Sequence, residues 1–384
     1  MRQMLSGCQQ RGTRLISNMG AANPAAAATK TREIAESLGI RDLKIAAITG
    51  DDVLPLLRKK YREEVHIIET GMPVSSLGDR LISANAYIGA EPIAEALRNG
   101  AQVVLGGRIA DPALFLAPLM YEFGWRTDDY EMLGRGILVG HLLECAGQLS
   151  GGYFADPPYK EVPDLAHLGF PYAEVGRDGL AEFSKLEGTG GQISVATCKE
   201  QLLYEVHNPG CYLTPDVTAD FSHVEFRPVM ADRVAAWGAT GTACPPTLKV
   251  SLGCLEGHIG EAQISYVGAG AEERGRLAIK IVREQLRLQH CEIDELRCDL
   301  IGINSVGPVR RRVCQAPEVR VRIAVRTQRM EDADLLVDTV EALYTNGPAA
   351  GGGVSKSVRP IIGILSALIP REDVSLEVQY EVTG

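Results

Sequence analysis

Short apolar runs alternate with helical patterns along the first half of the chain. The apolar runs predict buried strands at Arg14–Ser17, Leu43–Ile48 and Gln102–Leu105. Helical patterns predict one helix that begins near Pro24 and further helices at Val53–Lys60, Glu91–Asn99 and Pro112–Phe123. This strand–loop–helix rhythm predicts an α/β fold, with a mostly parallel sheet flanked by helices.

The pattern changes in the second half of the chain. Two strands, Thr247–Leu252 and Ala262–Val267, are expected on either side of a hairpin turn at Gly253–Glu261, and a helix at Glu272–Leu288. Further along, alternation predicts strands at Arg297–Ile303, Val319–Arg326 and Val374–Val382, and helical spacing predicts helices at Asp332–Tyr344 and Arg359–Leu368. We therefore expect two domains: a large α/β domain at 1–294 and a small C-terminal α+β domain of ferredoxin-like type at 295–384.

Composition narrows the classes of function. Hydrophobic residues make up 45% of the 384 residues, which is enough for a large core. The net charge of −10 argues against nucleic-acid binding, and the basic run at 310–312 is too short to change this. No apolar run is long enough for a membrane span, no secretion signal is visible, and the nine cysteines form no CxxC pair. We expect a cytoplasmic protein that binds neither nucleic acid nor membrane.

The loop after the third predicted strand combines glycines with charged residues. Gly106 and Gly107 permit close backbone approach, and Arg108 can hold a carboxylate or phosphate through two donors. Asp111 precedes Pro112 at the expected start of a helix. It is either a helix cap paired with an arginine, or an acid/base group or metal ligand beside a bound anion.

Polar residues also follow the first two predicted strands. Asp51 and Asp52 could bind a divalent metal or a hydroxyl-rich ligand, and they could equally cap the next helix. A divalent metal is therefore one cofactor to test, although the sequence does not identify which. Asn18 and Asn23 lie in the loop after the first strand, where we expect contact with substrate.

Four functional side chains lie at helical spacing in one short segment. His141, Glu144, Cys145 and Gln148 share a helix face between leucines, so they should be buried and hydrogen-bonded. The His141–Glu144 pair is the favoured proton donor and acceptor. A packed polar core is the alternative, and Cys145 as a nucleophile is less favoured than either.

Two glycine-rich loops are further candidates. Gly188, Thr189, Gly190 and Gly191 precede Ser194, the expected N-cap of a helix at Val195–Tyr204, and could form a cradle of backbone amides for an anion. The second loop, Thr345–Gly353, contains Asn346 and could close over substrate; a flexible surface loop is the alternative.

Several segments, taken in order, resemble the acyclic terpene utilisation (AtuA) family. The phrase GHLLECAGQLSGGYFADP at Gly140–Pro157 is the most specific of them. The others are Ser17–Pro24, Thr49–Val53, Ala84–Ala96, Val104–Pro118, Glu187–Ser222 and Thr345–Gly353. The resemblance covers residues 14–384. It also implies a glycine-rich strand and a helix ahead of Arg14 that this sequence does not contain, from which we expect either a start site further upstream or a sheet lacking that part.

The resemblance implies a role in the catabolism of citronellol, geraniol or related acids, through acyl-CoA intermediates. We therefore expect an enzyme that acts on an acyl-CoA thioester or a small branched carboxylic acid, with CoA as part of the substrate. Acid/base groups without a redox motif favour hydration or dehydration, with hydrolysis second. The alternative is a non-catalytic binding or assembly subunit of a CoA carboxylase or ligase. We also expect a homo-oligomer, and an active site that brings Arg108, Thr189 and His141 into one cavity.

Overall fold

The computed structural model describes residues 1–61, 63–307 and 316–384. The basic run at 310–312 lies outside them. The chain forms two compact units. Unit 1 comprises Met1–Ser75, Ala84–Ser251 and Ser366–Gly384, and unit 2 comprises Ser76–Ser83 and Leu252–Leu365. This division differs from the expected boundary at residue 294, because the last segment of the chain belongs to unit 1.

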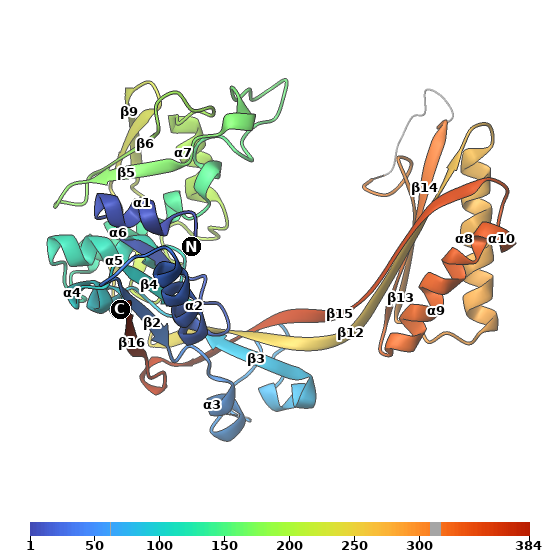
Figure 1. The fold of residues 1–384 in the computed structure, drawn as a ribbon, viewed down its shortest axis with the longest axis horizontal. Helices are drawn as coiled ribbons and strands as arrows, with labels where there is room; N and C mark the ends of the chain where they lie inside the picture. The colour runs from blue at the N-terminus through green and yellow to red at the C-terminus, as the bar shows by residue number, and fades with distance from the viewer. Residues whose placement is uncertain (62, 308–315) are drawn as a thin grey trace. The chain divides into compact units, whose positions relative to one another are not determined.

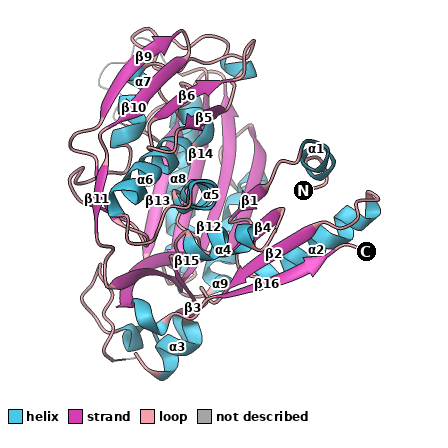
Figure 2. Ribbon diagram, turned by 90° about the vertical axis from the view of Figure 1, so that its left-hand side faces the viewer, coloured by secondary structure: helices cyan, strands magenta, loops and turns pink. Residues whose placement is uncertain are grey.

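Unit 1 contains a four-stranded, partly parallel sheet in the order β1-β4-β2-β16 (Figure 2). Its strands are β1 (Leu15–Ser17), β2 (Lys44–Thr49), β4 (Val103–Gly106) and β16 (Glu377–Val382). Strand β4 pairs in parallel with both β1 and β2, whereas β16 pairs with β2 in the antiparallel direction. The first three strands confirm the predicted ones. Apolar side chains of β2 and β4 are buried on both faces, as parallel sheets require.

Unit 1 also contains α-helices, which include those predicted near Pro24 and at Val53–Lys60, Glu91–Asn99 and Pro112–Phe123. They are α1 (Leu5–Arg11), α2 (Pro24–Ser37), α3 (Leu54–Lys59), α4 (Glu91–Arg98), α5 (Ala113–Phe123), α6 (Tyr130–Leu143) and α7 (Val195–Leu203). Pro24 occupies the first turn of α2, and the Asn23 side chain accepts from the amide of Ala26. Ser194 caps α7 through a reciprocal hydrogen-bond pair with Thr197, as its position predicted.

Two antiparallel sheets complete unit 1, and the sequence did not indicate them. One has the order β5-β6-β10-β9 and the other β11-β8-β7. Their strands are β5 (Pro171–Val175), β6 (Ala181–Lys185), β7 (Tyr212–Leu213), β8 (Thr218–Asp220), β9 (Glu225–Met230), β10 (Arg233–Trp237) and β11 (Thr240–Thr242). The fold is therefore mixed α/β, with one partly parallel sheet among several.

Unit 2 is built on a sheet in the order β13-β14-β12-β15, in which β14 pairs with both β13 and β12 in the antiparallel direction. Strand β3 (Leu81–Ala86) also pairs with β12, and end residues of β3, β12 and β15 belong to unit 1. The further elements of unit 2 are β12 (Thr247–Val267), α8 (Ala271–Leu288), β13 (Glu295–Ile301), β14 (Glu318–Thr327), α9 (Met330–Glu341), α10 (Leu343–Asn346) and β15 (Gly351–Pro370). Helices α8 and α9 lie beside the strands in Figure 1, and their apolar side chains join one core with β12 and β14. Among the described residues, no helix has the length and apolar character needed to cross a bilayer.

Three predictions for this half of the chain are wrong. The segment Arg359–Leu368 is not a helix but part of β15, because its isoleucines favour extended backbone. The expected hairpin at Gly253–Glu261 lies inside the 21-residue strand β12. The predicted strand at Val374–Val382 exists as β16, but it joins the sheet of unit 1 rather than the small α+β domain.

Candidate functional site

The loops after β1, β2 and β4 converge at the carboxyl ends of these strands. The Asn18 side-chain amide donates to Asp111 Oδ1 at 2.7 Å. The buried Asp51 carboxylate accepts from the Asn85 side-chain amide at 3.0 Å and from the backbone amide of Arg108 at 2.9 Å. Polar groups that are far apart in the sequence thus meet at one edge of the sheet, where open α/β sheets bind ligands.

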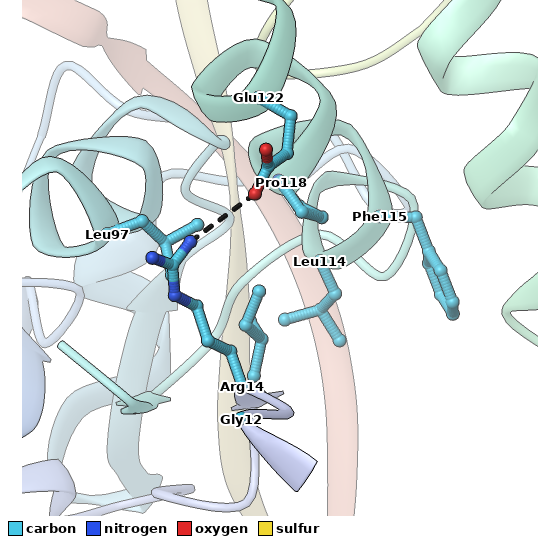
Figure 3. A pocket seen from close by; sticks show the side chains of 8 residues that line it. Gly12, Arg14, Leu97, Leu114, Phe115, Pro118 and Glu122 are labelled. Carbon is cyan, nitrogen blue, oxygen red and sulfur yellow. Dashed lines mark hydrogen bonds and ion pairs between the residues drawn. The ribbon is translucent and has the colours of Figure 1, made fainter. Parts of the chain in front are cut away.

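A cavity of about 540 Å³ lies elsewhere in unit 1, beside Arg14 (Figure 3). Arg14 is already engaged, donating to the Tyr121 hydroxyl at 2.8 Å and lying 3.5 Å from the Glu122 carboxylate. The larger cavity of unit 1, of about 630 Å³, adjoins the converging loops. Polar residues that include Tyr87, Asp111, Glu144, Tyr212 and Lys249 line it, together with the apolar side chains Ile68, Leu213, Leu248 and Leu368. This combination can hold an apolar molecule with a few oriented polar groups.

Glu144 reaches this cavity from the end of α6, where it hydrogen-bonds His141. The Nδ1 atom of His141 lies 2.8 Å from Glu144 Oε1, and its Nε2 atom lies 3.1 Å from the Leu202 carbonyl oxygen in α7. A carbonyl only accepts, so Nε2 carries a proton. The bond between Nδ1 and Glu144 then needs one further proton, held either by the carboxyl group or by the imidazole.

The surroundings of Glu144 stabilise its protonated form. Burial raises the pKa of the Glu144 carboxyl; the bond to His141 opposes this rise, and the charges of Asp111 and Glu205 add to it. His141 is only 1% exposed and lies 5.7 Å from the Phe221 ring and 5.2 Å from the Tyr212 ring, measured between centroids. The pair is therefore held in a fixed and largely desolvated position, with Glu144 in the cavity wall.

Close packing of α6 against the loop that contains Asp111 brings the carboxyl groups of Glu144 and Asp111 to one cavity. An added Cβ at Gly140 would lie 2.4 Å from the Pro112 carbonyl oxygen, so only glycine permits this approach. We expect Gly140→Ala to push α6 away, to lower the free energy of unfolding by about 1–3 kcal/mol and to reduce ligand binding.

Chemical denaturation and calorimetry of Gly140→Ala measure both effects. The matched control is Gly7→Ala in α1, where an added Cβ meets nothing within 4 Å and alanine is the better helix former. Equal stability of the two variants would contradict the packing argument.

The structure also brings residues to the cavity that no sequence pattern had indicated. Tyr87 lines the cavity, and the Arg108 guanidinium stacks on its ring at 4.4 Å from the centroid while donating to its hydroxyl. Lys249 also lines the cavity, with Nζ 5.5 Å from the same centroid. Glu205 lines it with a backbone φ of 58°, in the left-handed region that non-glycine residues rarely adopt. A lone tyrosine, lysine or glutamate carries no spacing signal that could have revealed them.

Several expected site residues have structural partners instead. Asp111 is not the cap of α5, because its carboxylate binds Asn18 and the cap position is Pro112. Asp52 accepts from the Leu54 amide at 3.0 Å, just before the start of α3, although the cap position of this helix is Val53. In the described residues, no group of three or more His, Cys, Asp or Glu side chains is arranged to hold a metal ion.

The segment after His141 is not one continuous helix. Helix α6 ends at Leu143, so Cys145 and Gln148 lie beyond it. Both nitrogens of His141 are occupied by Glu144 and the Leu202 carbonyl, which leaves none for Cys145. Burial raises the pKa of the Cys145 thiol, which keeps the thiol protonated.

The glycine-rich candidates lie away from this cavity's lining. The amides of Thr189, Gly190 and Gly191 donate to the carbonyls of Leu186, His167 and Pro163, and Gly188 is also absent from the lining, so no amide cradle faces the cavity. Asn346 ends α10 in unit 2. Gly106 and Gly107 lie against Ile109 and the Asp51 carboxylate, where an added Cβ would fall within 2.1 Å and 2.4 Å respectively. Asp111 and Glu144 thus line one cavity, and His141 is joined to it through the hydrogen bond to Glu144. Arg108 contacts Tyr87, which is part of the lining, whereas Thr189 is not part of it.

Fold and site together define a mixed α/β protein with a hydrogen-bonded His141–Glu144 pair beside a largely apolar cavity. The family description "Acyclic terpene utilisation family protein AtuA" matches residues 1–380. The chain belongs to this family. No curated protein matches it. Among solved structures, it is similar to "De novo designed protein Foldit4", with 18% identity over 27% of this chain and 94% of that chain, at a TM-score of 0.20.

Proposed function

We propose that this protein is an enzyme of hydratase or lyase type in acyclic terpene utilisation. The observation that carries the proposal is the Glu144–His141 pair, which holds a proton at the wall of a cavity that Asp111 also lines. An acid and a base on one apolar cavity are what addition of water to a double bond requires. The substrate is an acyl-CoA thioester or a small branched carboxylic acid, whose apolar chain suits Ile68, Leu213 and Leu368.

In the hydration direction, Glu144 gives its proton to one carbon of the double bond, and a water molecule adds to the other carbon. Asp111, oriented by Asn18, accepts the proton that this water loses. The alkene and water become an alcohol, and the proton on Asp111 returns through solvent to the Glu144–His141 pair. Dehydration runs through the same groups in reverse.

The test is an assay in oxygen-18-labelled water with geranoyl-CoA, citronellyl-CoA and the corresponding free acids. We expect the product mass to rise by one labelled water, and Asp111→Asn to slow turnover by about a hundredfold. Asp128→Asn, which alters only an exposed ion pair with Arg126, is the control. Binding of these compounds without any turnover would contradict the enzyme and favour an assembly subunit of a CoA carboxylase or ligase.

We also propose that unit 2 has a ferredoxin-like fold. Its element order β12-α8-β13-β14-α9-β15 and its strand order β13-β14-β12-β15 support this. This order differs from the β-β-α-α-β order that the sequence suggested, because β12 is its first strand and β15 its last.

A further inference from the structure

Two cations lie against the aromatic ring of Tyr87, which lines the larger cavity of unit 1 together with Lys249. The Arg108 guanidinium carbon is 4.4 Å and the Lys249 Nζ atom 5.5 Å from the Tyr87 ring centroid. Backbone contacts fix the three residues together, because the Tyr87 amide donates to the Lys249 carbonyl at 2.8 Å and the Ile88 amide to the Arg108 carbonyl at 3.0 Å. The two positive charges are therefore held at one place.

Neither cation is paired with a carboxylate among the residues that the structure describes. Asp111 binds Asn18, and Asp51 accepts from the backbone amide of Arg108 rather than from its guanidinium. Glu69 accepts from the Ser366 amide at 2.9 Å, which lowers the pKa of Glu69, and the charge of Lys249 helps to lower it, but Glu69 forms no ion pair with Lys249. Many other arginines and lysines of this acidic chain form ion pairs, such as Lys30 with Glu33 on α2. The charges of Arg108 and Lys249 thus remain available to a ligand.

The Tyr87 hydroxyl adds a third donor to this group. It accepts a hydrogen bond from the Arg108 guanidinium, so its own proton is free to be donated elsewhere. An anion beside Tyr87 would meet the hydroxyl, the ammonium group of Lys249 and the remaining guanidinium donors. Charge-assisted donors of this kind bind carboxylates and phosphates about twice as strongly as neutral ones.

We propose that Tyr87, Arg108 and Lys249 form a carboxylate-binding subsite, and that the substrate is the free acid rather than its CoA thioester. The inference rests on the proposed function and narrows its substrate class. Tyr87 and Lys249 line the same cavity as Glu144 and the apolar residues Leu213 and Leu368. The anionic group must therefore belong to the molecule that fills this cavity. A thioester lacks a carboxylate, and the phosphates of CoA are separated from the acyl group by the pantetheine arm.

Calorimetric titration with citronellic acid, its primary amide and its CoA thioester tests the subsite. We expect the acid to bind more tightly than the amide, and Lys249→Gln and Arg108→Gln each to weaken acid binding by about 10–100-fold while leaving amide binding unchanged. Lys30→Gln, in the exposed ion pair on α2, is the matched control. Thermal unfolding of each variant verifies that it is folded.

Two outcomes would overturn the subsite: equal loss of acid and amide binding in the variants, or tighter binding of the thioester that both substitutions weaken. Turnover separates this inference from the proposed function. If the acid binds through Lys249 and Arg108 but is never hydrated, the subsite stands and the proposed reaction fails. If hydration occurs unchanged in both variants, the reaction stands and the subsite fails.

Discussion

Replacing Glu144 with glutamine should lower kcat by about 10²–10⁴-fold and leave substrate binding nearly unchanged. The glutamine amide can donate to Nδ1 of neutral His141 while Nε2 still donates to the Leu202 carbonyl, so the hydrogen bonds of the native pair persist. What disappears is a proton that can be transferred. Steady-state kinetics of Glu144→Gln, together with its dissociation constant for the same substrate, measure the two quantities separately.

The pH profile provides an independent check of this role. Burial raises the pKa of Glu144, and the active form holds the proton, so kcat of the native enzyme should fall as pH rises through this raised value. The control is Glu200→Gln on α7, which removes the exposed ion pair between Glu200 and Lys160. If Glu144→Gln retained kcat within a factor of about three of the native value, the proton donor would have to be another group.

Replacing Asp216 with asparagine should stabilise the protein at neutral pH. Asp216 Oδ1 accepts from the Ala90 amide at 2.7 Å, but Oδ2 is shielded from solvent and has no hydrogen-bond partner among the residues that the structure describes. Burial raises the pKa of Asp216 to about 6, and the Glu91 charge adds to the rise while Arg371 opposes it. Since one pKa unit corresponds to about 1.4 kcal/mol, ionising this group in the folded chain costs about 3 kcal/mol.

The sign of this effect follows from linkage. The folded pKa lies above the unfolded value, so the native protein loses stability as pH rises from about 4 to about 6 and keeps the full penalty at neutral pH. Asp216→Asn should remove this slope from denaturation curves recorded at several pH values. Asp220→Asn is a control of opposite sign, because the bond from Ser222 lowers the pKa of Asp220. An unchanged slope in Asp216→Asn would contradict the assignment.

The elements of the parallel sheet were predictable because their signals are local. The apolar run of β2, the proline that begins α2 and the serine that caps α7 each act within one turn or strand. Strand β15 was not predictable in this way. Isoleucines and leucines near residues 361–368 also match helical spacing, and only pairing with β12, about a hundred residues earlier in the chain, determines that they are extended.

The candidate site likewise contains some residues with a local sequence signal and others without one. His141 and Glu144 are three residues apart, and their contact follows from helix geometry alone. Asp111 and Arg108 follow a buried strand, which is a local signal for a ligand loop. Lys249, in contrast, lies in β12, more than a hundred residues beyond Tyr87, and no periodicity relates the two positions. The amide cradle at Gly188–Gly191 looked plausible because the sequence does not reveal which carbonyls its amides already bind.

Strand β16 completes the sheet of unit 1 from the far end of the chain, with Glu377 opposite Thr49 and Val382 opposite Lys44. During synthesis on a ribosome, β1, β2 and β4 emerge well before β16, so one edge of β2 stays open until Glu377–Val382 have left the exit tunnel. A pairing over so many residues is slow to form. Until β16 has emerged, the nascent chain would therefore expose an unpaired apolar strand, which is the kind of surface that chaperones bind.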